Sequence, residues 1–104
     1  MIHVVAVITA KPGQREKVLQ AVKENLPKVL AEKGCIEYGP AIDAEGAAGK
    51  GAFGPDTVVI IEKWETMDDL KNHAAAPHMA EYAAKTKEFL ESRLIHVLEP
   101  VKFQ

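Results

Sequence analysis

The chain has 104 residues, of which 47% are hydrophobic and 27% charged, and its formal net charge is −2. This length predicts one domain, residues 1–104, and the hydrophobic content excludes a disordered chain. Because charges of both signs are interspersed without a basic stripe, neither nucleic acid nor an anionic membrane is an expected partner. The single Cys35 excludes an internal disulfide, and the N-terminal apolar run is too short for a membrane span, so we expect a cytoplasmic protein.

The first third of the chain predicts a strand followed by a helix. Residues 2–10 are rich in Val and Ile, which predicts a strand that is buried on both faces for much of its length. Residues 14–33 carry apolar side chains at helical spacing along one face. We expect Pro27 to kink this helix and Gly34 to cap its C-terminus.

The middle of the chain predicts two strands joined by a long loop. Residues 35–42 form the second predicted strand, and the small-residue stretch 43–55 is a loop. Residues 56–64 predict the third strand, in which alternation places Glu62 and Trp64 on the same face as Val58 and Ile60.

The last third predicts a broken helix and a final strand. Thr66 is the expected N-cap of a short helix, and Pro77 should interrupt it and start a second helix that continues to about residue 92. Residues 94–103 predict the last strand, where Pro100 indicates an edge position or a bulge.

The resulting order is βαββαβ, which is typical of an α+β, ferredoxin-like fold with a four-stranded antiparallel sheet and helices on one face. The other sheet face would still carry alternating Val and Ile side chains. Because an apolar sheet face is unfavourable in water, we expect a homodimer formed through this open face.

His73 is the leading candidate for a catalytic group. It borders the predicted buried side of its helix, and a histidine near the core can act as a base because its ordinary pKa lies close to neutrality. The alternative is a structural histidine bonded to Glu62, Tyr38 or a backbone carbonyl.

Several other side chains could bind a small planar molecule. Trp64 could stack on a ring and donate its indole N–H, or could be a core aromatic, and Glu62 beside it could orient His73. A hydroxyl at Tyr38 could bond a ligand oxygen, although packing explains that residue equally well. The remaining candidates for substrate binding are His78, Met79 and Tyr82. For His78, the alternative to substrate binding is a surface or capping role.

We predict neither a metal site nor a phosphate loop. His73 and His78 are five residues apart across a proline, which is not the spacing of a helical metal site. The glycines of 43–55 have no helix behind them, so a phosphate loop is not indicated. No cluster of Arg or Lys is evident near the candidate site, where Lys71 and Arg93 are the only near cations, and this disfavours a phosphorylated substrate.

A set of short motifs spans nearly the whole chain. The sequence has Pro12-Gly13 after a Val-rich strand, Gly34-Cys35-x-x-Tyr38, and Glu62-x-Trp64 followed by His73 and then by Pro77-His78-Met79. In this order the motifs resemble the antibiotic biosynthesis monooxygenase (ABM) family. The resemblance implies a dimeric α+β barrel. Its haem-degrading branch is disfavoured, because the first strand has no Asn and no His follows His78 in the helical region.

The function that we expect is that of a cofactor-independent monooxygenase or quinol oxidase acting on a small planar hydroxy-aromatic or quinol. An electron-rich phenolate can pass an electron to O₂ directly, so the protein need only deprotonate, hold and desolvate the substrate. Two alternatives stay open. One is a non-catalytic ligand-binding dimer of the stress-response type, and the other is an isomerase of a small polar metabolite.

Overall fold

The computed structural model describes residues 1–47 and 50–103. Its elements follow the predicted order, with the second helix of the pattern broken into α2 and α3. The bounds in chain order are β1 (Ile2–Ala10), α1 (Arg15–Leu30), β2 (Cys35–Ala41), β3 (Thr57–Trp64), α2 (Met67–Ala74), α3 (Pro77–Thr86), a 3₁₀ turn (Lys87–Phe89) and β4 (Leu90–Leu98).

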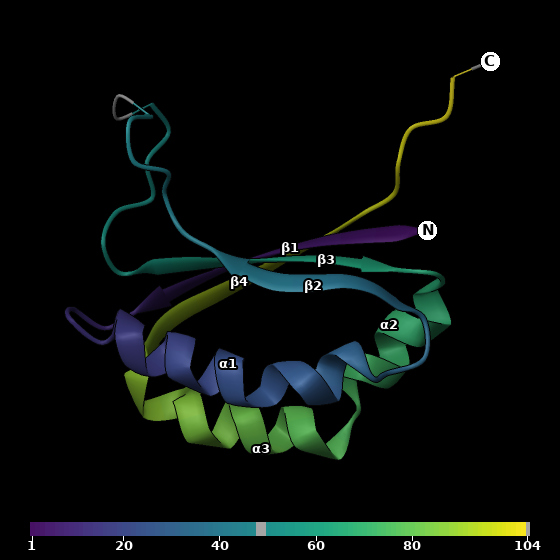
Figure 1. Cartoon of the computed structure of the whole chain (residues 1–104), viewed down its shortest axis with the longest axis horizontal. Coiled ribbons are helices and arrows are strands. Elements are labelled where there is room, and N and C mark those ends of the chain that lie inside the picture. The colour runs from purple at the N-terminus through teal and green to yellow at the C-terminus, as the bar shows by residue number, and fades with distance from the viewer. Residues whose placement is uncertain (48–49, 104) are drawn as a thin grey trace.

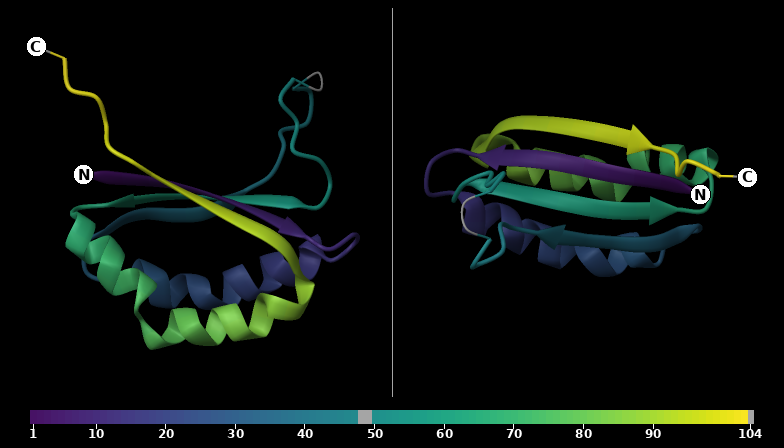
Figure 2. Two further views of the ribbon diagram at one scale, coloured as in Figure 1. Left: turned by 180° about the vertical axis from the view of Figure 1, so that it is seen from behind. Right: turned by 90° about the horizontal axis from the view of Figure 1, so that it is seen from above.

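One four-stranded sheet carries all the strands, in the spatial order β2-β3-β1-β4. Each neighbouring pair is antiparallel. The helices lie on one face of this sheet, with α1 and α3 side by side (Figures 1 and 2). The ferredoxin-like α+β architecture predicted from the pattern is therefore confirmed.

The hydrophobic core fills the space between the sheet and the helices. In β1 the residues alternate between buried and half-buried, so that Val4, Ala6 and Ile8 face the helices. Val18 and Val22 of α1 pack against this side. Within one chain the described helices cover only one face of β1, so the residues of its other face are half-buried and not buried as predicted.

The outer face of the sheet is apolar and open. Pairing places Val7 of β1 opposite Leu94 of β4, and Val5 opposite Ile61 of β3. Leu94 is 59% exposed and Ile61 is 40% exposed. Among the described residues, no helix is both long and apolar enough to cross a membrane.

The start of the last strand differs from the prediction by four residues. The helical pattern predicts a helix to about residue 92, but α3 ends at Thr86 and β4 begins at Leu90. Leu90 pairs with Ala10, and β4 follows β1 as far as Leu98. Strand pairing therefore overrides the helical spacing of this segment, and Pro100 lies beyond the strand instead of within it.

Two helix ends position the site. The N-cap of α2 is as predicted, because Thr66 Oγ1 accepts a hydrogen bond of 3.1 Å from the Asp69 N–H. Helix α1 ends at Leu30, three residues earlier than predicted, and Pro27 lies in its last turn. Gly34, with φ of +81°, is therefore not the cap residue itself but part of the turn that leads into β2.

Candidate functional site

A cavity of about 370 Å³ lies between the sheet and helices α2 and α3. Its lining is mainly apolar, with a few polar side chains that converge on it. The sheet contributes Val4, Ala6, Ile8, Tyr38, Ile60 and Glu62, and the helices contribute Leu70, His73, Met79 and Tyr82. Such a combination of apolar walls and few polar groups is typical of a small-molecule site.

His73 lies in the last turn of α2 and is buried. Its Nδ1 is 2.7 Å from Glu32 Oε2. Because an ionised carboxylate only accepts hydrogen bonds, Nδ1 is the donor and Nε2 keeps a lone pair. The bond partner is thus neither Glu62, Tyr38 nor a backbone carbonyl. The geometry leaves His73 with one ring nitrogen that can take a proton from a ligand.

Two aromatic rings hold the His73 imidazole. The Trp64 ring lies 4.6 Å from it between centroids, at an interplanar angle of 34°. The Tyr38 ring lies 5.5 Å away in a T-shaped arrangement, at an interplanar angle of 62°. Trp64 is fully buried and does not line the cavity. Of the two roles considered for Trp64, that of a core aromatic fits this position. Trp64 therefore packs against His73 from the side away from the cavity and does not face a ligand.

Glu62 lines the cavity at the base of this cluster. Its Oε1 accepts a hydrogen bond of 2.9 Å from the indole N–H of Trp64. Burial raises the pKa of Glu62 above its ordinary value, and the Trp64 hydrogen bond and the nearby His73 oppose this effect only in part. Glu62 therefore contacts Trp64 directly and does not bond His73, which differs from the predicted orienting role.

We expect Glu62→Gln to be more stable than the wild type at pH 7. Folding raises the pKa of the Glu62 carboxyl, so the folded protein favours the protonated form. The stability that this preference contributes is lost as the pH rises through the pKa of the folded state. Glutamine keeps an oxygen for the Trp64 N–H without the buried charge. Urea unfolding at several pH values should show the advantage of the variant shrinking as pH falls toward 4. An advantage independent of pH would contradict this assignment.

Three further predicted residues line the cavity, namely Tyr38, Met79 and Tyr82. Burial is the main cause that raises the pKa of each tyrosine above its ordinary value. Both phenols therefore keep their protons and can donate hydrogen bonds to a ligand oxygen.

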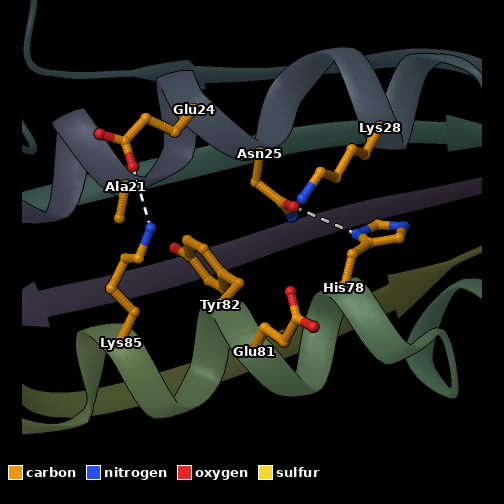
Figure 3. A pocket seen from close by; sticks show the side chains of 8 residues that line it. All are labelled: Ala21, Glu24, Asn25, Lys28, His78, Glu81, Tyr82 and Lys85. Atoms are coloured by element: carbon orange, nitrogen blue, oxygen red, sulfur yellow. Dashed lines mark hydrogen bonds and ion pairs between the residues drawn. The ribbon is translucent and has the colours of Figure 1, made fainter.

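His78 does not line this cavity. It opens onto a separate groove of about 90 Å³ between α1 and α3 (Figure 3). Its Nδ1 lies 3.2 Å from Asn25 Oδ1, and its Nε2 lies 3.3 Å from Glu32 Oε2. His78 therefore lies beside Glu32, the hydrogen-bond partner of His73. It does not reach the cavity, where a substrate contact was predicted.

Glu32 was not among the residues predicted for the site, and neither Lys71 nor Arg93 was assigned a role in it. Glu32 is 41 residues from His73, and no motif joins them. Lys71 and Arg93, which were named from the sequence as the only near cations, both line the cavity. Within residues 1–47 and 50–103, no group of three or more His, Cys, Asp or Glu side chains is arranged to hold a metal ion.

Comparison with known proteins agrees with this architecture. Residues 1–85 match the family model described as antibiotic biosynthesis monooxygenase. A protein of Escherichia coli strain K12 named "Probable quinol monooxygenase YgiN" is 35% identical over 102 residues, which cover 96% of this chain and 98% of that protein.

Solved structures share the fold at lower identity. PA3566 from Pseudomonas aeruginosa superimposes with a TM-score of 0.81 at 22% identity, covering 97% of this chain and 94% of that chain. Rv0793 from Mycobacterium tuberculosis gives a TM-score of 0.79 at 23% identity, covering 98% and 96%. The family match extends over most of the chain and includes β1, α1, the β2–β3 pair and the helix that carries His73. The chain therefore belongs to the antibiotic biosynthesis monooxygenase family.

Proposed function

We propose that the protein is a cofactor-independent monooxygenase that oxidises a small planar quinol or hydroxy-aromatic in the cavity. The observation that carries the proposal is the buried His73, whose Nδ1 hydrogen bond to Glu32 leaves Nε2 as a base at an apolar cavity. Membership of a monooxygenase family and the likeness to a protein named as a quinol monooxygenase support the reaction class.

In the proposed reaction, His73 Nε2 removes a proton from a substrate hydroxyl. The electron-rich anion then reduces O₂ directly, one oxygen atom enters the product and the other leaves as water, so the substrate supplies all the electrons. Tyr38 and Tyr82 donate hydrogen bonds to substrate oxygens. The apolar walls exclude water, which strengthens these interactions and protects the reactive anion.

Oxygen uptake tests this proposal. The purified protein, without added cofactor, is assayed with a panel of hydroquinones and anthrone-type phenols against an autoxidation blank. Uptake well above the blank supports the monooxygenase, and its absence on every substrate overturns it. Lys71 and Arg93 at the cavity favour a second candidate, an isomerase of a small anionic metabolite, which would consume no oxygen.

The proposed partner on the outer sheet face is a second copy of the chain. Leu94 lies on this face and is among the most exposed large apolar side chains of the strands. We expect Leu94→Glu to convert a dimer into a monomer, because a charge cannot be buried unpaired in such an interface. Sedimentation velocity measures the change. Leu30→Glu makes the same substitution on α1, which lies on the other face of the sheet. This variant is the control and should leave the dimer intact.

A wild-type protein that sediments as a monomer would contradict the proposed interface. So would a Leu94→Glu variant that stays dimeric at the lowest concentration measured. Both results are independent of any activity.

A further inference from the structure

Three ionisable side chains from separate parts of the chain meet behind the cavity. Glu32 follows α1, His73 ends α2 and His78 begins α3. One oxygen of Glu32, Oε2, lies 2.7 Å from His73 Nδ1 and 3.3 Å from His78 Nε2. A single carboxylate oxygen therefore lies between two imidazoles.

The two imidazoles belong to different hollows of the molecule. His73 lines the cavity between the sheet and the helices, whereas His78 lines the groove between α1 and α3 (Figure 3). The exposed fraction of the side chain is 6% for His73, 16% for Glu32 and 17% for His78. The cluster thus connects the mainly apolar cavity to the more exposed side of the helical layer.

The hydrogen-bond partners fix where the protons lie. Asn25 Nδ2 donates a hydrogen bond of 3.3 Å to the sulfur of Met79, so Asn25 Oδ1 faces His78 Nδ1 and accepts a hydrogen bond from its N–H. In the neutral ring this leaves a lone pair on His78 Nε2, which is buried and makes no hydrogen bond to any residue within 1–47 and 50–103. A lone pair and a carboxylate oxygen 3.3 Å apart attract each other only when a proton lies between them.

We propose that Glu32 and His78 form a proton relay that carries the substrate proton from His73 to the groove between α1 and α3. When His73 Nε2 takes the hydroxyl proton, the Nδ1 proton passes to Glu32 Oε2. Glu32 then passes a proton to His78 Nε2, and the resulting imidazolium releases one to water in the groove. One proton leaves the cavity in this deprotonation step. When His73 Nε2 later gives its proton to the oxygen that leaves as water, a proton returns along the same path and restores the N–H at His73 Nδ1. The cycle therefore balances, and no electrons move along the path.

The groove is suited to receive that proton. Glu24, Lys28, Glu81 and Lys85 line it together with His78, so it is polar and open to water. Glu24 and Lys85 form an ion pair of 3.0 Å there (Figure 3). Because Glu81 makes no hydrogen bond or ion pair with Glu32, His73 or His78, Glu81→Gln provides a control that changes the groove charge without touching the path.

The kinetic test rests on the proposed function. His78→Phe keeps a ring in place but removes both nitrogens. We expect its oxygen uptake in weak buffer to fall at least tenfold in kcat with little change in KM, and added imidazole to restore it. Glu81→Gln should resemble the wild type in both respects. Unchanged kcat in His78→Phe, or a loss that imidazole does not restore in the folded variant, would overturn the relay.

A second measurement does not depend on activity. In ¹⁵N-labelled protein, the exchange of the His73 Nδ1 proton with water is followed by NMR. The relay predicts exchange at least tenfold slower in His78→Phe than in the wild type or Glu81→Gln, and exchange within twofold of the wild type would overturn it. His78→Gln replaces His78→Phe if the latter does not fold. Slower exchange in a protein without oxygen uptake would refute the monooxygenase while retaining the relay.

Discussion

Replacing His73 with alanine is expected to lower oxygen uptake by about 10²–10⁴-fold, which is the usual effect of removing a positioned base. Among the described residues that line the cavity, only the His73 imidazole combines two features. One ring nitrogen makes a defined hydrogen bond, and the other keeps a lone pair. The phenols of Tyr38 and Tyr82 cannot replace it, because burial raises their pKa and keeps them protonated. The measurement is kcat/KM on the best quinol found.

Asn72→Ala is the matched control for this variant. Asn72 precedes His73 on α2 but is exposed, and alanine is a better helix former, so the helix should remain intact. Its activity should equal that of the wild type. A loss below tenfold in a folded His73→Ala protein would remove His73 from the role of base and direct attention to Glu62.

The fold was predictable because its main signals are local. The richness of residues 2–10 in Val and Ile gave β1 its correct bounds, and alternation in β3 placed Glu62 and Trp64 on the buried face. The start of β4 was not predictable in the same way. The segment around Leu90 continues the helical spacing of α3 without a Gly or Pro, and only pairing with Ala10 makes it a strand.

The site was predicted in part for a related reason. His73 and Tyr38 meet at the cavity because each lies on the inner side of its own element, which periodicity reveals. The contact between Glu32 and His73 depends on where α1 ends, and a helix extended to residue 33 would have assigned Glu32 to a solvated surface. For Trp64 the sequence left ligand stacking and core packing both open, because periodicity gives the face of a strand but not the depth of a side chain.

Gly34→Ala is expected to destabilise the protein by about 3 kcal/mol or more, or more than about 10 °C in Tm. Gly34 has φ of +81°, a conformation that costs a residue with a Cβ roughly 1–2 kcal/mol. An added Cβ would also lie 2.7 Å from the Cβ of Asp69 and closer still to its carboxylate. Asp69 is fixed there by its backbone bond to Thr66, so it cannot withdraw easily.

A second glycine with positive φ separates the two causes. Gly13 has φ of +77° but nothing within 4 Å of an added Cβ, so Gly13→Ala should show the backbone cost alone, roughly 1–2 kcal/mol. The additional loss in Gly34→Ala is then the steric contact with Asp69. Combining Gly34→Ala with Asp69→Ala should recover part of it. Urea unfolding of the wild type, Gly34→Ala, Asp69→Ala and the double variant measures the coupling. Equal losses at Gly13 and Gly34 would show that the turn moves away from α2, which would also displace Glu32 from His73.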